Sequence, residues 1–322
     1  MVRLINFEEA LRETEGADRT LVVGNGFSAQ YFNYASLFAA SGLRSGTPVS
    51  NLFKIMKTVD FEAIVRALEG AIAVEIAYGH HDHADQLQEH AQAVREGLIR
   101  AVHRTHPTHR RELSRSYDTS ADFLTLFQKV FTLNYDLILY WVNLQHRVLR
   151  DGFGLGAYEG TFIGPFSHDA ACTLYNLHGG LHLFDNGAGE MMKALDAGAG
   201  VISTISRTIR ATRRFPVYVA EGTSAQKMSK INSVSYLRHC YDALCQNSAV
   251  VFVYGHSADE NDAHIYRAIF TSEARHIFFG VYEPDRIKLQ MLDGVISKYQ
   301  KTAGSPAGYT FFDSSSARVW DI

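Results

Sequence analysis

The chain has 322 residues, of which 46% are hydrophobic and 20% charged, and its formal net charge is −3 at pH 7. This composition is typical of a soluble globular protein with one large domain or two modest ones. The near-neutral charge argues against a protein that coats nucleic acid, so we expect no direct nucleic-acid binding. No run reaches the ~18 apolar residues of a membrane span, and the amino terminus lacks a signal sequence. We therefore expect no membrane contact and a cytoplasmic location.

Strand-like and helical patterns follow one another along most of the chain. The predicted elements in chain order are a helix over 7–11 capped by Asn6, a strand over 20–23, a charged helical segment over 42–117, a strand over 130–133, a helix over 135–149, strands over 172–177 and 217–220, a helix start at 221–224, a helix over 231–244, a strand over 250–254, a helix over 263–270, a strand over 277–281, a helix over 284–299 and a strand over 309–312. Such alternation predicts an α/β fold, in which a Rossmann-like parallel sheet has helices on both faces. Residues 1–41 and 118–322 would form this domain, with 42–117 as a helical insertion.

The first strand is followed by a glycine-rich loop. Its sequence is Gly24-Asn25-Gly26-Phe27-Ser28, and Ala29 completes the spacing Gly-x-Gly-x-x-Ala between a strand and a predicted helix. Two glycines let the backbone approach a pyrophosphate, which predicts a nucleotide site, although a glycine pair also serves any tight turn. An NAD dehydrogenase would carry an acidic residue ~20 positions further on. Residues 44–50 contain none, which disfavours hydride transfer.

Polar residues also follow the strand over 130–133. Asn134, Tyr135 and Asp136 come directly after it, and Thr132 lies within it. The carboxamide of Asn134 offers both a donor and an acceptor, so it could orient a water molecule or a sugar hydroxyl. Asp136 could contact a ligand or simply cap the next helix. The carboxyl ends of parallel strands bind ligands, so these residues are candidates for a site.

The strand over 172–177 ends at His178, which is followed by two glycines. Glycine would let a ligand come close to the ring, and a histidine can accept a proton near neutral pH. His178 is therefore a candidate general base. A lone histidine is more often structural, and this alternative stays open.

The loop after the strand over 250–254 repeats the pattern. Its candidate ligand-binding residues are Gly255, His256, Ser257, Asn261 and Asp262. Backbone amides after the glycine would make an anion or ribose site, and the last two side chains could bond ribose hydroxyls. Ser257 and Glu260 also have the spacing of a helix capping box, which is an equally weighted structural alternative.

Taken in order, these four runs resemble the bacterial sirtuin-like NAD hydrolases, including those used in antiphage defence. The likeness is greatest to a stand-alone, uncharacterised sirtuin-like branch of about this length, and it spans residues 21 to 270. The resemblance implies that Asn134 and His178 are the catalytic pair. It also implies an NAD-binding set that consists of Gly24, Asn25, Gly26, Phe27, Ser28, Thr132, Tyr135, Asp136, Gly255, His256, Ser257, Asn261 and Asp262.

Protein-deacylating sirtuins carry a four-cysteine zinc module, whereas the three cysteines here are Cys172, Cys240 and Cys245. With no cysteine before residue 172, the resemblance argues against a deacylase, and these thiols are expected to be buried. The implied reaction is hydrolysis of NAD to nicotinamide and ADP-ribose, or to a cyclised form, in antiphage or abortive-infection defence. Such activity would be held low until a separate activating protein or homo-oligomerisation completes the pocket.

Two alternatives remain open. One is a module that binds NAD or ADP-ribose as a sensor, with little or no turnover. The other is a metal hydrolase built on one of two histidine runs: His80, His81, Asp82 and His83, or His103, His106 and His109. Pro107 interrupts the second run and the first lies in a polar stretch, so we expect no metal.

Overall fold

The computed structural model describes residues 3–32, 37–113, 116–154, 156–196, 200–219 and 222–320. Ala220 and Glu221, which fall within two of the predicted elements, lie outside the described residues. Among the described helices, none is long and apolar enough to cross a membrane.

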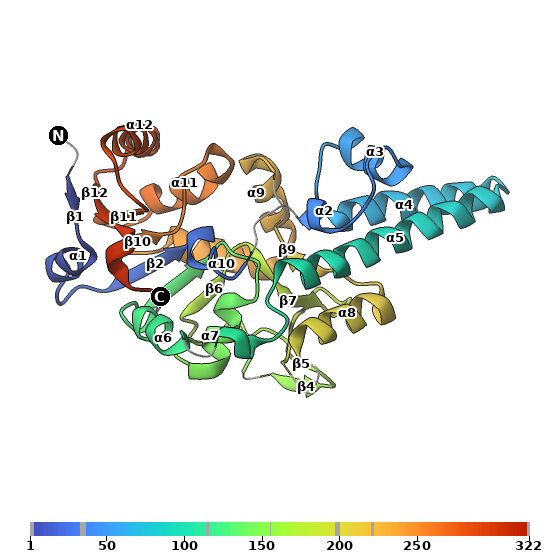
Figure 1. The fold of residues 1–322 in the computed structure, drawn as a ribbon, viewed down its shortest axis with the longest axis horizontal. Helices are drawn as coiled ribbons and strands as arrows, with labels where there is room; N and C mark the ends of the chain where they lie inside the picture. Colours follow the sequence, from blue (N-terminus) through green and yellow to red (C-terminus); the bar gives the residue numbers. More distant parts are fainter. Residues whose placement is uncertain are drawn as a thin grey trace.

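Seven parallel strands form the main sheet, in the order β1-β12-β11-β10-β2-β3-β6 (Figure 1). Their bounds are β1 (Leu4–Ile5), β2 (Arg19–Val23), β3 (Lys129–Thr132), β6 (Leu174–Asn176), β10 (Val250–Tyr254), β11 (His276–Val281) and β12 (Gly308–Asp313). The chain passes from the interior strand β2 to β3 and β6 on one side, and returns to β10 on the other. Ligands bind at such a switch point, outside the carboxyl ends of the strands.

Helices cover both faces of this sheet, which confirms the predicted fold class. The helices on one face are α1 (Phe7–Glu13), α6 (Tyr117–Thr125) and α7 (Ile138–His146), and those on the other are α10 (Ser235–Cys245), α11 (Ala263–Thr271) and α12 (Arg286–Ala303). Side chains of a strand alternate between the faces, so Leu21 and Val23 pack in one apolar cluster and Val22 in the other. Asn6 caps α1 by accepting a hydrogen bond from the Glu9 amide, as predicted.

A second, antiparallel sheet was not predicted. It has the order β4-β5-β8-β7-β9, and its strands are β4 (Ala157–Glu159), β5 (Phe162–Gly164), β7 (Gly179–Asp185), β8 (Met191–Ala194) and β9 (Pro216–Tyr218). The strand expected over 217–220 therefore belongs to this sheet and not to the parallel one, because β9 pairs antiparallel with β7. Helix α8 (Val201–Thr212) connects β8 to β9.

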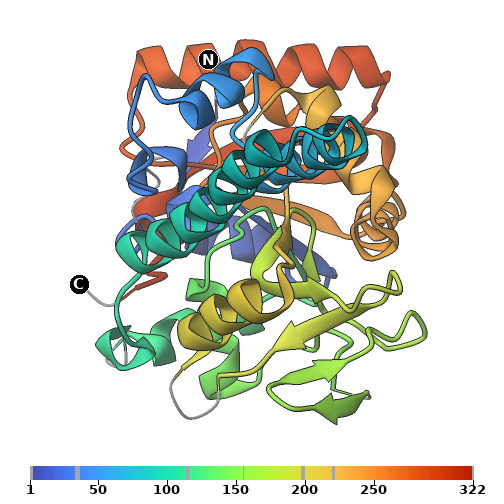
Figure 2. The same cartoon turned by 90° about the vertical axis from the view of Figure 1, so that its right-hand side faces the viewer.

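The segment over 42–117 is helical, as its texture predicts. The helices in and next to it are α2 (Leu37–Ala40), α3 (Pro48–Ile55), α4 (Phe61–Ala77), α5 (His81–Thr105) and the 3-10 helix η2 (Arg110–Leu113). The antiparallel pair of α4 and α5 projects away from the sheets, and it lies nearest the viewer in Figure 2. The base of the pair shares an apolar cluster with the main sheet, since Phe61 and Leu98 are buried in the same cluster as Phe252. The division into a separate insertion stays a prediction.

Two helix predictions need correction. The helix expected over 231–244 is two helices, α9 (Ser224–Ser233) and α10, because Val234 has an extended backbone (φ −124°, ψ 116°) that breaks the hydrogen-bond ladder. The loop after β2 does not lead directly into an α-helix: it forms the 3-10 helix η1 (Asn25–Phe27) and then turns through residue 31. Ala29 is exposed there. The helix start expected at 221–224 is confirmed, with Thr223 as the cap of α9.

Candidate functional site

The loops after β2 and β10 pack directly against each other at the switch point. Gly26 donates its backbone N–H to the Gly255 carbonyl oxygen at 2.7 Å. A Cβ atom on Gly26 would lie 2.5 Å from the Gly255 Cα, and one on Gly255, which has φ +69°, would lie 2.7 Å from the Gly26 Cα. No side chain fits between these backbones. The close packing of the two loops therefore explains why both positions are glycine. The sequence alone suggests a different explanation, either a bound pyrophosphate or a tight turn.

Most amides of the first loop are already engaged. The N–H groups of Gly24, Phe27 and Ser28 donate to the carbonyl oxygens of Tyr254, Gly24 and Asn25, at 2.9, 3.0 and 3.1 Å respectively. An anion at this loop would therefore have to compete with internal hydrogen bonds. Phe27 is fully buried against Trp320, with ring centroids 5.1 Å apart, and lies in the core.

A buried polar network joins the loops after β2 and β3. The Asn134 side chain donates from Nδ2 to the Gly24 carbonyl oxygen at 3.0 Å and to Ser28 Oγ at 3.2 Å. Ser28 in turn donates to Asp136 Oδ1 at 3.1 Å, and that oxygen also accepts the Ile138 amide at the start of α7. The N-cap residue of α7 is Leu137, so Asp136 stands one position before the cap and accepts the amide two residues further on, while it also holds the network together. Each such hydrogen bond contributes about 1 kcal/mol, so the network fixes the spacing of the two loops.

The Asn134 side chain keeps one unused acceptor. Its Oδ1 is buried and accepts no hydrogen bond from the residues that the structure describes. A buried carbonyl oxygen without a donor is costly, by roughly 1–3 kcal/mol, and marks a place for a water molecule or a ligand hydroxyl. The Asn134 amide is fixed by Thr132 Oγ1 at 3.1 Å, so the backbone at this strand end is fixed too.

These loops surround a cavity of about 330 Å³. Its lining residues come from the ends of β2, β3, β6, β9 and β10 and from α9, namely Asn25, Leu133, Tyr135, His178, Val219, Lys227, Gly255, His256, Ser257 and Asp262. A crevice with a few convergent polar groups is the usual form of a small-molecule site. The cavity is the candidate functional site.

Asp262 is the electrostatic centre of the cavity. Its Oδ1 lies 2.7 Å from Lys227 Nζ, and its Oδ2 lies 3.3 Å from His256 Nε2. His256 Nδ1 accepts hydrogen bonds from the Ala258 amide and the Tyr266 hydroxyl, so its proton is on Nε2 and is donated to Asp262. Burial would raise the pKa of Asp262, but the hydrogen bond from His256 and the neighbouring positive charge hold this pKa below its ordinary value.

His178 is buried beside this carboxylate. Its Nε2 is 3.9 Å from Asp262 Oδ1, and its carbonyl oxygen accepts the Val219 amide at 2.8 Å, which fixes the backbone. Burial lowers the pKa of His178 to about 3, against the opposing attraction of Asp262. The ring is therefore neutral at pH 7 and can accept a proton or a hydrogen bond.

A second buried histidine, which sequence reasoning missed, connects His178 to α9. His264 Nε2 lies 3.1 Å from His178 Nε2, so one ring donates to the other. Ser224 Oγ accepts the His264 amide at 3.0 Å and lies 3.1 Å from His264 Nδ1. Burial lowers the pKa of His264 to about 4. The result is a polar chain from Ser224 through His264 to the cavity.

His178, Asp262 and His264 also have the geometry of a metal cluster, since their ligand atoms lie within 4.8 Å of one another. The Lys227 ammonium, however, already contacts Asp262 Oδ1 and supplies the positive charge that a divalent ion would bring. A metal ion here would face that ammonium at close range. The donor set does not fit a metal while Lys227 is present.

The structure brings together seven of the predicted site residues as lining of the cavity: Asn25, Tyr135, His178, Gly255, His256, Ser257 and Asp262. Five further predicted residues are not among the lining residues, and their hydrogen bonds position the loops: Asn134, Ser28, Asp136, Gly24 and Thr132. The capping box expected at Ser257 is replaced by Asp259, whose side chain accepts the amide of the exposed Asn261. Ligand contact by these residues stays a prediction.

Sequence reasoning also missed Lys227. It follows no strand and lies in a polar helix without a motif, so only its folded position reveals it. In the second histidine run, His106 is a packing residue: its Nδ1 donates to the Val102 carbonyl oxygen at 2.9 Å and its Nε2 accepts the Leu137 amide at 3.2 Å. Cys172 and Cys240 are buried free thiols, as predicted, and Cys245 is partly buried.

The parallel sheet and the crevice at its switch point define an α/β protein with a cavity formed by strand-end loops. The chain belongs to the family described as Domain of unknown function (DUF4917), whose sequence model matches residues 21–320. A comparison with curated proteins gives no match. Among solved structures, the chain is similar to a crystal structure of a Sir2 homolog-NAD complex, with 11% identity, a TM-score of 0.38, and coverage of 94% of this chain and 97% of that chain.

Proposed function

We propose that the protein is an NAD glycohydrolase that cleaves the bond between nicotinamide and ribose. The main support for this proposal is the position of His178, whose buried and neutral imidazole lines the cavity next to the Asp262 carboxylate. The resemblance of the four loop motifs to sirtuin-like NAD hydrolases supplies the substrate class. In the reaction, the C1′–N bond breaks and its electron pair leaves with the nicotinamide nitrogen, while a water oxygen bonds C1′ and releases one proton.

This chemistry needs positioning and charge stabilisation more than a strong nucleophile, because the cleavage passes through an oxocarbenium-like state. His178 would accept the proton of the attacking water or of a ribose hydroxyl, and Asp262 would stabilise the imidazolium that forms. Asn134 would act indirectly in this step, because it is not among the residues that line the cavity and its Nδ2 holds the loops through the Gly24 carbonyl oxygen and Ser28 Oγ. General-base help of this kind contributes ~10²–10⁴-fold to the rate.

One observation favours the sensor as a second candidate. A histidine whose pKa is about 3 is a weak base at pH 7, so the same cavity could bind NAD or ADP-ribose with little turnover. This candidate keeps the loops, Asn25 and Ser257, but does not need the His178 ring for a proton transfer. Turnover therefore distinguishes the two.

The test is nicotinamide release from NAD by the purified full chain, with products identified by mass. His178→Ala should lower the rate by ~10²-fold or more. His182→Ala is the matched control, because His182 is also buried with a pKa lowered to about 3, but stacks on Tyr140 away from the cavity lining. Equal loss in both variants would show a general effect on folding and would contradict the proposal. Binding of NAD without release in wild type would favour the sensor.

We further propose that this activity serves antiphage or abortive-infection defence and stays low until an activating protein or self-association completes the pocket. Unrestrained loss of NAD would harm the host cell, which is the reason to expect restraint. A concentration series tests it: the rate per chain should rise with protein concentration or on addition of an activator. Full turnover by a dilute monomer would contradict the restraint but not the hydrolase.

A further inference from the structure

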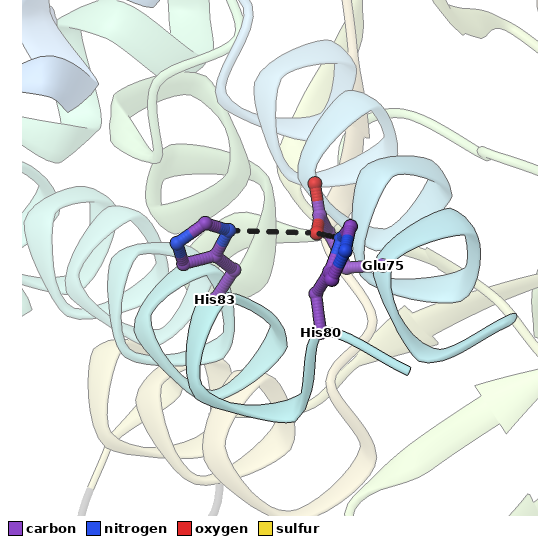
Figure 3. A group of neighbouring side chains, drawn as sticks. All are labelled: Glu75, His80 and His83. Carbon is purple, nitrogen blue, oxygen red and sulfur yellow. Dashed lines mark hydrogen bonds and ion pairs between the residues drawn. The ribbon is translucent and has the colours of Figure 1, made fainter. Parts of the chain in front are cut away.

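Three potential metal ligands converge at the tip of the α4–α5 hairpin. Glu75 lies in the last turn of α4, His80 is the N-cap of α5, and His83 lies in its first turn. Figure 3 shows both imidazole rings beside the Glu75 carboxylate, with dashed lines from one nitrogen of each ring to the same oxygen. Glu75 Oε2 is 2.8 Å from His80 Nδ1 and 3.6 Å from His83 Nδ1, and the three ligand atoms all lie within 4.8 Å of one another.

The turn that holds these groups together is formed by the backbone. Gly79 has φ +79°, a left-handed conformation that ends α4, and the His80 amide donates to the Glu75 carbonyl oxygen at 2.8 Å. The side chains of Glu75 and His80 therefore start from the same turn. Helix α5 then places His83 one turn further along on the same side.

The charge around this tip favours a cation. Between Arg66 and Arg95 the chain has no lysine or arginine, whereas its acidic residues are Glu69, Glu75, Asp82, Asp85 and Glu89. The cavity cluster differs, because there the Lys227 ammonium lies beside the Asp262 carboxylate, where a cation would otherwise bind. Two imidazoles and one carboxylate are a donor set that suits Zn²⁺, with tetrahedral ligand atoms ~3.3 Å apart and a fourth position for water or a partner group.

Against the sequence-based expectation of no metal, we propose that Glu75, which the sequence did not single out, joins His80 and His83 to bind a divalent transition-metal ion of the zinc class at the hairpin tip. This site is separate from the cavity and does not depend on the proposed hydrolase. Nitrogen donors dominate it, so Zn²⁺ should bind well ahead of Mg²⁺ or Ca²⁺. The ion would fix the two helix ends to each other at the point furthest from the sheets.

The experiment is a calorimetric titration of the full chain, without a polyhistidine tag, with Zn²⁺ in buffer free of chelators. Wild type should bind one equivalent that excess Mg²⁺ does not displace. His80→Ala and His83→Ala should each weaken binding by about tenfold or more, and Glu75→Gln should act in the same direction. His81→Ala is the matched control, because His81 is an exposed neighbour in the same turn outside the cluster.

Several results would overturn the proposal. They are no zinc binding by wild type, equal weakening by His81→Ala, or an undiminished equivalent in the His80→Ala/His83→Ala double variant. All substituted histidines are exposed, so circular dichroism should show unchanged folding, and a loss of binding then reports the ligands themselves.

Discussion

Two clusters of histidine and carboxylate bring their ligand atoms equally close together, yet their surroundings differ. In the cavity, His178, Asp262 and His264 are mostly buried, and Lys227 neutralises the carboxylate. At the hairpin tip, Glu75 and its two histidines are in an acidic stretch without a basic residue. Because a buried ammonium and a divalent cation exclude each other, the first cluster suits proton transfer or ligand binding and the second suits a metal. Geometry alone cannot separate these uses.

The buried histidines of the chain predict a loss of stability in acid. His178 and His182 have pKa values of about 3, and His106 and His264 of about 4, because burial penalises the charged ring. Unfolded histidines titrate near 6.5, so the unfolded chain binds more protons below that pH. The stability from these four is intact above pH 6.5 and falls as the pH drops toward 4, by up to about 1.4 kcal/mol per pH unit for each ring.

Urea unfolding at several pH values between 7.5 and 4.5 measures this slope. His182→Phe should remove about 1.4 kcal/mol per pH unit from it, because one titrating ring is gone. A wild-type stability that is flat across this range would contradict the buried, neutral state of these four histidines.

Removal of the Lys227 ammonium should leave the cavity cluster without a basic residue beside its carboxylate, as at the hairpin tip. Lys227→Met leaves Asp262 buried without its ammonium, which should cost about 3 kcal/mol of unfolding free energy. Lys230→Met is the control, since Lys230 pairs with Glu62 in a more exposed setting and should cost about 1 kcal/mol or less. Equal losses in the two variants would contradict the special role of the Lys227 ammonium.

The same variant should also gain a zinc site. In a background that lacks His80 and His83, Lys227→Met should bind one Zn²⁺ through the cavity histidines, whereas the background alone should not. Calorimetry reads this directly. If the added substitution brings no zinc binding, Lys227 is not what excludes a metal from the cavity.

The smallest expected effects come from glycine substitutions, one in a cavity loop and one in the α4–α5 hairpin. Gly26→Ala would place a Cβ atom 2.5 Å from the Gly255 Cα and force the loops apart, at a cost of about 1–3 kcal/mol. Gly70 lies within α4, and a Cβ atom added there would meet nothing within 4 Å, so Gly70→Ala should stabilise the chain by about 0.5–1 kcal/mol. Thermal unfolding of both variants checks the opposite signs.

The parallel sheet could be predicted because its strands are short apolar runs that end in glycine or polar residues. Val22 and Phe252 belong to such runs, and the aligned carboxyl ends of the strands bring their loops together. The second sheet could not be predicted, since its strands are short and pair through a hairpin and a helical connection that leave little periodicity. Tyr135, His178 and Asp262 are far apart in the sequence but line one cavity. Their proximity could be predicted, because the carboxyl ends of parallel strands meet at one edge of the sheet.

The parts of the site that escaped prediction are those without a local signal. Lys227 and Ser224 lie on a helix after the second sheet, and His264 lies in the first turn of α11, where it reads as an ordinary helical residue. Lys227 contacts Asp262, and Ser224 contacts His264, only because α9 and α11 pack over the edge of the sheet. Only tertiary structure supplies that information.

The proposed function requires that NAD bind in the cavity formed by the strand-end loops, and calorimetry on two variants can show whether it does. His178→Ala should be inactive yet bind one equivalent of NAD by calorimetry. Adding Ser257→Trp, at an exposed position on the cavity lining, should abolish that binding by filling the crevice without disturbing the core. Equal NAD affinity in both variants would contradict the account, because the ligand would then bind elsewhere.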